Sequence, residues 1–232
     1  MLTNFSIATD PQKIAKQFSV ELPENYQPTY NANPTQKLPI ITSANPEKVE
    51  LVHWGSTEAF SKSKSVSGKL LFAPAEEIQT KSSLKKNFSN RRCVILADSF
   101  YAWKEIAKKE KVPYRFYIGE NNLFAIAGLW DSFEDEDGAV VNTFMMITTA
   151  ANNTVSEVSE RMPAILNEDL LIEWLNEDTK DDSLLEFIKP YQPNDLDKYT
   201  INPKLADPNF NDSKLWERVP SANQFGNLTL FN

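Results

Sequence analysis

The chain has very few of the residues that most often carry catalytic or metal chemistry. Its 232 residues include one cysteine, Cys93, and one histidine, His53. A single cysteine forms no internal disulfide and leaves no thiolate-rich metal site. Phosphate-loop, dinucleotide-binding, His-Glu-x-x-His and Gly-x-Ser-x-Gly motifs are also missing. We therefore expect neither a metal centre nor a cofactor, and we expect Cys93, which begins an apolar run, to be a buried and inert thiol.

Glycine and long apolar runs are scarce as well. Six glycines in 232 residues exclude collagen-like and glycine-linker architectures. No apolar run approaches the roughly 18 residues that indicate a membrane span. A secretory signal begins with a basic residue followed by a long apolar segment, and residues 1–9 have neither feature. These absences predict a cytoplasmic protein without membrane association.

The charge of the chain is unevenly distributed. Its 24 basic and 32 acidic residues give a net charge of −8. Residues 62–115 nevertheless hold 13 basic and five acidic residues, a local excess of +8. Such a block is compatible with nucleic-acid contact, although the acidic remainder opposes long-range attraction to phosphate. Lysines spread over solvated surfaces are the more common explanation of such a block.

Short strand-forming runs fill the middle of the chain, and helical patterns flank them. Asp10 followed by Pro11 predicts a capped helix start, because the carboxylate accepts from free amides and proline loses no bond there. Helices are also predicted over residues 74–88 and 167–175, and a last strand over 227–231. The predicted central strands cover 38–42, 49–54, 94–97, 100–103, 114–118, 123–127 and 143–148. The absence of repeats and long linkers favours one α+β domain.

Four stretches in a fixed order carry a family resemblance. They are residues 30–41, 91–104, 124–131, and 147–152 followed by Glu160-Arg-Met-Pro163. Together they resemble the SRAP family (SOS-response-associated peptidase, the abasic-site-processing proteins). The resemblance implies a single SRAP-like domain over residues 1–232. It also implies a branched, barrel-like mixed β-sheet flanked by helices, with a basic groove for single-stranded DNA.

The resemblance also implies a specific covalent chemistry. In this family methionine is removed to expose an N-terminal cysteine, whose amine and thiol capture the aldehyde of an abasic site as a thiazolidine. An α-amine is a competent nucleophile near neutral pH, and the neighbouring thiol closes the ring. An asparagine positions the cysteine, a glutamate supplies acid–base help, and a histidine assists proton transfer at the sugar.

All four family positions are replaced in this chain. The cysteine of Met-Cys-Gly-Arg-Phe falls on Leu2, and the asparagine falls on Phe72. The glutamate of Phe-Tyr-Glu-Trp falls on Ala102, and the histidine of His-x-Arg-Met-Pro falls on Ser159. Leu2 has no thiol, and its bulk should also block removal of Met1. The sequence therefore predicts a pseudoenzyme that cannot form the thiazolidine crosslink.

The binding groove of the family is partly retained. Two family arginines fall on Asn4 and Pro74, and each lost phosphate contact weakens DNA binding and its salt dependence. Asn31, Trp54 and Arg161 remain and are the candidate DNA-binding residues. Weak association with single-stranded or abasic DNA is therefore one alternative function.

Two further alternatives stay open. The first is a protein-interaction or scaffolding role, in which the groove receives an apolar partner whose identity the sequence does not give. Phe72 filling the vacated pocket is favoured over that role, because interiors tolerate few voids. The second is an active abasic-site processing protein that uses replacement residues. Ser159 lacks a histidine close in sequence, and Glu105 and Glu160 are expected to face away from the vacated positions.

Overall fold

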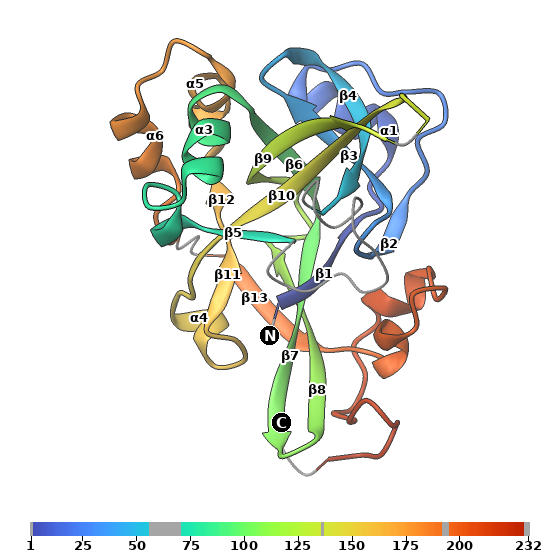
Figure 1. The fold of residues 1–232 in the computed structure, drawn as a ribbon. Coiled ribbons are helices and arrows are strands. Elements are labelled where there is room, and N and C mark those ends of the chain that lie inside the picture. Colours follow the sequence, from blue (N-terminus) through green and yellow to red (C-terminus); the bar gives the residue numbers. More distant parts are fainter. Residues whose placement is uncertain (1, 56–70, 136, 192–194, 230–232) are drawn as a thin grey trace.

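The structure is a computed structural model that describes residues 2–55, 71–135, 137–191 and 195–229 (Figure 1). One of its two sheets has five strands in the order β13-β8-β7-β1-β2, and all of its pairings are antiparallel. The strands are β1 (Leu2–Ile7), β2 (Thr29–Ala32), β7 (Ser99–Ala107), β8 (Glu110–Ile118) and β13 (Leu196–Thr200). In the β1–β7 pairing, Leu2 lies opposite Ala102.

The second sheet closes on itself as a barrel. Its ring consists of β3 (Lys37–Thr42), β4 (Asn45–Trp54), β6 (Arg92–Ala97), β9 (Phe124–Glu134) and β10 (Val140–Ala150). The ring is closed because β10 pairs with β9 on one edge and in parallel with β4 on the other. Short strands branch from it: β5 (Phe72–Pro74) and β11 (Arg161–Pro163) on β10, and β12 (Ile165–Leu166) on β9. The expected α+β fold with a branched, barrel-like mixed sheet is confirmed.

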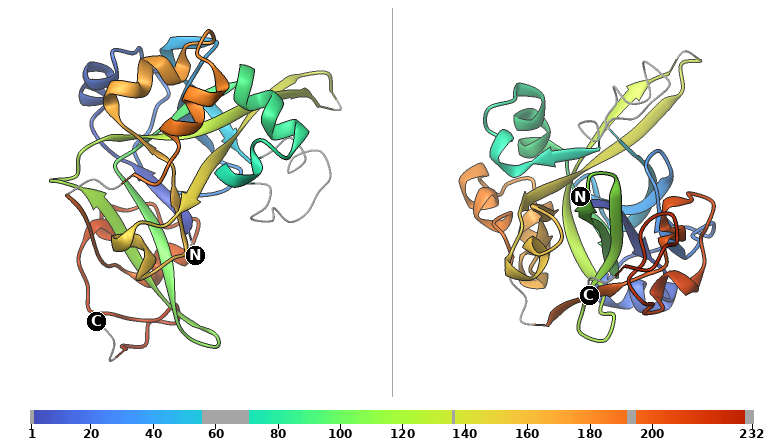
Figure 2. Two further views of the ribbon diagram at one scale, coloured as in Figure 1. Left: turned by 90° about the vertical axis from the view of Figure 1, so that its left-hand side faces the viewer. Right: turned by 90° about the horizontal axis from the view of Figure 1, so that it is seen from below.

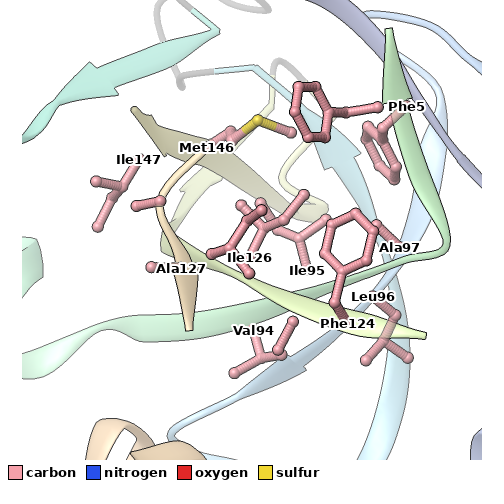
Figure 3. Packing of buried hydrophobic residues seen from close by; sticks show 14 of the residues in the cluster. Phe5, Val94, Ile95, Leu96, Ala97, Phe124, Ile126, Ala127, Met146 and Ile147 are labelled. Atoms are coloured by element: carbon pink, nitrogen blue, oxygen red, sulfur yellow. The ribbon is translucent and has the colours of Figure 1, made fainter. Parts of the chain in front are cut away.

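The core lies inside this barrel and between the two sheets. Phe5, Ile95, Ile126 and Met146 are fully buried, and their side chains point toward a common interior in Figure 3. Gly128 allows a close approach of β9 and β6, because a Cβ there would lie 2.7 Å from the Cys93 sulfur. Tight packing of this kind fixes the relative positions of β6 and β9.

Most helices lie on one side of the barrel, away from the C-terminal segment (Figure 2), whereas the short helix α4 lies beside β11 and β13 (Figure 1). The helices are α1 (Pro11–Phe18), α3 (Ser82–Asn90), α4 (Asn153–Ser156), α5 (Leu171–Leu175) and α6 (Asp181–Phe187). Asp10 caps α1 by accepting from the amides of Gln12 and Lys13, so that predicted helix start is confirmed. None of the helices in the described part of the chain is long and apolar enough to cross a membrane.

Three predicted elements are wrong in detail. The helix expected from Pro74 begins only at Ser82, because residues 72–74 form β5 and a 3-10 turn, η2 (Ala75–Glu77), follows. Proline is tolerated in a short strand at a sheet edge. The helix expected over 167–175 divides into a 3-10 turn, η3 (Glu168–Leu170), and α5. In the described part of the expected last strand, Leu228 makes only an isolated bridge to Ala222; residues 230–231 lie outside the described residues.

Arg92, the first residue of β6, connects two helices to the barrel through hydrogen bonds. Its guanidinium is fully buried and donates to the carbonyls of Phe88 and Ser89 at the end of α3, at 2.8 and 2.7 Å. It also donates to the carbonyls of Trp174 and Asn176 at the end of α5, both at 2.7 Å. A cation at two helix C-termini is favourable because the last carbonyls of a helix lack partners within it.

The C-terminal segment packs on the outer face of the five-stranded sheet. It contains two 3-10 turns, η4 (Pro203–Ala206) and η5 (Ser213–Trp216). Asn31 anchors it by donating to the carbonyls of Leu205, Asp207 and Phe210 at 3.1–3.3 Å. The segment therefore connects back to β2, next to the N-terminal strand.

Candidate functional site

A cleft of about 1400 Å³ opens beside the first residue of β1. Leu2, Phe72 and Ser159 line it, and the β1–β7 register places buried Ala102 directly opposite Leu2. Three of the four positions to which the resemblance assigns catalytic roles thus line one cleft, and the fourth, Ala102, is the strand partner of Leu2. None of the four side chains carries a carboxylate, a thiol or an imidazole.

The wall of the cleft at Leu2 and Phe72 is apolar. Leu2 is buried, and partly buried Phe72 packs edge-on against Trp54 with their ring centroids 5.8 Å apart. Phe72 packs against the core on one side and lines the cleft on the other, and its filling of the vacated pocket stays a prediction. Cys93 lies in the core, where burial raises the pKa of its thiol well above the ordinary value. The chain's single thiol is therefore neither ionised nor accessible.

The Ser159 hydroxyl is hydrogen-bonded to the backbone of Arg161. It donates to the carbonyl of Arg161 at 2.8 Å and accepts from the Arg161 amide at 3.3 Å. Because its proton is bonded to a backbone carbonyl, the hydroxyl is not prepared for nucleophilic attack. Glu105 and Glu160, expected to face away from the vacated positions, both line the same large cleft. Among the residues that the structure describes, no group of three or more His, Cys, Asp or Glu side chains forms a metal site.

Arg161 is the candidate DNA-binding residue that lies in the cleft. Its two terminal nitrogens donate to the two carboxylate oxygens of Glu76 at 2.8 and 3.0 Å. One of these nitrogens, Nη2, also donates to the carbonyl and hydroxyl oxygens of Thr148, at 2.6 and 3.0 Å. The hydrogen bond from Arg161 lowers the pKa of Glu76. Sequence reasoning did not single out Glu76, because its partner lies 85 residues away and no local pattern connects them.

The other two candidates, Asn31 and Trp54, are buried. Trp54 is fully enclosed, and its indole donates to the carbonyl of Leu71 at 3.2 Å. The Asn31 amide is only 1% exposed, and it accepts from the side chain of Asn4 at 3.1 Å. Both residues position neighbouring segments as they stand here. Direct DNA contact by Asn31 or Trp54 stays a prediction, and the burial of both side chains does not support it.

Asn4, at a family arginine position, faces inward. Its amide nitrogen donates to Asn31 Oδ1 and the Ala32 carbonyl, both at 3.1 Å, and to Asn33 Oδ1 at 2.8 Å. Only 7% of Asn4 is exposed. The side chain is therefore used to connect β1 with β2 and offers nothing to a ligand in the cleft.

The described wall of the cleft is not basic. Its ionisable side chains are seven acids and five bases: Glu76, Glu77, Glu105, Glu110, Asp131, Glu157, Glu160, Lys81, Lys104, Lys109, Lys111 and Arg161. Three of the acids besides Glu76 are paired with bases: Glu77 with Lys81, Asp131 with Arg91, and Glu157 with Lys198. The basic block of the sequence also loses Arg92 and Arg115 to the interior, while Lys62, Lys64 and Lys69 lie outside the described residues. This arrangement attracts phosphate less than a groove lined by unpaired cations.

The order of the motifs, the barrel and the cleft at Leu2 all point to one family, and sequence comparison decides the matter. The profile of the family described as SOS response associated peptidase (SRAP) matches residues 1–208. The chain belongs to the SRAP family. The resemblance inferred from its motifs is therefore confirmed.

Relatives of this SRAP chain include bacterial and animal proteins. It is 33% identical over 222 residues to the abasic site processing protein YoqW of Bacillus subtilis, covering 94% of this chain and 99% of YoqW. It is 28% identical over 221 residues to the abasic site processing protein HMCES of Rattus norvegicus, covering 78% of this chain and 61% of HMCES. A crystal structure of a protein from Bacteroides thetaiotaomicron matches with a TM-score of 0.82 at 24% identity, over 94% of this chain and 99% of that one. This last likeness concerns the fold alone.

Proposed function

We propose that this chain is a non-crosslinking member of the SRAP family. Its relatives are named abasic site processing proteins, and by that kinship its cleft is a place for DNA with a missing base. Covalent capture of an aldehyde needs a nucleophile whose lone pair is available near neutral pH. Leu2 stands where the family resemblance places that nucleophile.

The observation that supports this proposal is that Leu2, Phe72 and Ser159 line one cleft, with Ala102 paired to Leu2. Each of the four residues that would share the reaction is replaced in the sequence. A single replacement leaves room for partial activity. Four replacements remove the thiol, the positioning amide, the acid–base carboxylate and the proton-transferring imidazole together.

The test is incubation of the protein with a single-stranded oligonucleotide carrying an abasic site, followed by a denaturing gel. We expect no heat-stable adduct with the protein as it is. A variant carrying Leu2→Cys, Phe72→Asn, Ala102→Glu and Ser159→His should gain one, and Leu2→Cys alone should gain much less. Circular dichroism establishes that each variant is folded before its result is read. A heat-stable adduct with the unaltered protein would refute the proposal.

Non-covalent occupancy of the cleft is the second candidate function. The open cleft favours it, because the apolar part of the cleft wall that water reaches gains free energy when a partner covers it. Fluorescence anisotropy at two salt concentrations separates the possible partners. Binding of labelled single-stranded DNA that weakens with salt supports a nucleic-acid role, and no binding at low salt removes it.

A further inference from the structure

The guanidinium of Arg161 already holds a two-oxygen ligand, and that ligand is part of the chain. The Glu76 carboxylate meets both terminal nitrogens of Arg161 side by side. An arginine presents this paired edge equally well to a carboxylate and to a phosphate, because both offer two oxygens at a matching spacing. Arg161 is the one arginine among the described residues that line the cleft.

We propose that Glu76 is an internal competitor for a phosphate site at Arg161. The inference rests on the proposed function, since it concerns non-covalent occupancy of the same cleft. A phosphate group, whether a nucleic-acid phosphodiester or free inorganic phosphate, binds the Arg161 edge only when the Glu76 carboxylate leaves it. Glu76 thereby keeps the affinity of the cleft for phosphate low.

The geometry allows exchange at this position. Side-chain exposure is 35% for Arg161 and 58% for Glu76, so the pair faces solvent and is open to displacement. Exposed ion pairs contribute little stability, because water competes for both partners. The pair is therefore weak enough to be broken by an entering anion.

Thr148 keeps the guanidinium in place when Glu76 is absent. Its carbonyl and hydroxyl oxygens both accept from Nη2 of Arg161. The backbone of Arg161 is also fixed, since it pairs with Ala150 in the β10–β11 ladder. Arg161 without Glu76 thus remains pre-organised, with its free edge available to an anion.

The neighbouring residue supplies a matched control. Glu77 lies in the same 3-10 turn, lines the same cleft and pairs with Lys81, not with Arg161. Glu76→Gln and Glu77→Gln therefore change the net charge of the protein equally. Only Glu76→Gln releases Arg161.

The experiment measures binding of a short fluorescein-labelled oligothymidylate by anisotropy at low salt. We expect Glu76→Gln to bind about 10-fold more tightly than Glu77→Gln, since one charge-assisted paired contact is gained. Its salt dependence should steepen by about one phosphate contact. Adding Arg161→Gln to Glu76→Gln should abolish the gain.

Each possible outcome decides the matter. A gain of about threefold or more over Glu77→Gln that depends on Arg161 supports the proposal; a smaller gain, a loss, or a gain that survives Arg161→Gln overturns it. Competition by inorganic phosphate, compared with sodium chloride at equal ionic strength, then identifies the ligand. If phosphate displaces the oligonucleotide more strongly than chloride, the site binds free phosphate as well. If both salts compete equally, the site is one for phosphodiesters. The probe carries no abasic site, so an adduct in the crosslinking assay would refute the proposed function without affecting this result.

Discussion

Arg92 and Arg91 are adjacent in sequence but make opposite kinds of contact, which gives a sharp test of the fold. Replacing Arg92 with methionine keeps most of the side-chain length and removes four hydrogen bonds to backbone carbonyls. Two of these bonds are buried and two are partly buried. We assign about 1.5 kcal/mol to each buried carbonyl left without a partner and about 0.5 kcal/mol to each that water can reach. The free energy of unfolding should fall by about 4 kcal/mol.

The measurement is urea unfolding followed by tryptophan fluorescence. With a denaturant slope of about 3 kcal/mol per molar, the midpoint of Arg92→Met should fall by about 1.3 M. Arg91→Met is the control, because Arg91 forms a partly exposed ion pair with Asp131 and stacks on Trp130, with 5.3 Å from its guanidinium carbon to the ring centroid. Such contacts contribute about 1 kcal/mol or less. Equal midpoint shifts for the two variants would show that the buried cation does not hold α3 and α5.

Three further predictions concern single contacts. Arg161→Gln should raise the pKa of Glu76 toward its ordinary value, as followed by carboxyl NMR titration. The stability from this pair is fully present above the ordinary pKa and is lost as pH falls through the lowered value. An unchanged Glu76 titration would contradict this assignment. Asn31→Ala should destabilise the protein by about 1–3 kcal/mol and speed proteolysis within residues 201–219, and unaltered cleavage would count against the anchor. Cys93 should react with a thiol reagent only on unfolding, so prompt labelling of the native protein would contradict its burial.

The strands were predictable because their side chains carry the signal locally. Runs such as those that became β6 and β9 are continuous and apolar, as expected for strands enclosed on both faces. The α1 start was equally clear, since Asp10 and Pro11 act within one turn. Pro74 misled the prediction, because proline suits a first helical turn and a short edge strand alike.

The candidate site was only partly predictable. Family motifs identified Leu2, Phe72, Ala102 and Ser159; three of them line the cleft and Ala102 pairs with Leu2, while their role stays a prediction. The assignment of Trp54 to DNA contact came from kinship, which does not say which side of a barrel a strand residue faces. The Glu76–Arg161 pair depends on where β10 places two distant segments, and no local pattern in the chain encodes that.

The amide cluster of Asn4 and Asn31 has a practical consequence for engineering this protein. The Asn31 amide donates to three carbonyls of the C-terminal segment, and it accepts from the side chain of Asn4. Asn4 is two residues from Leu2 along β1. Trimming the chain after β13 to obtain a smaller protein would take those carbonyls away and leave the Asn31 amide without its acceptors. Loss of these hydrogen bonds would loosen Asn31, its partner Asn4 and the part of β1 that borders the cleft. A tag or fusion should therefore be added after the C-terminal segment and should not replace it.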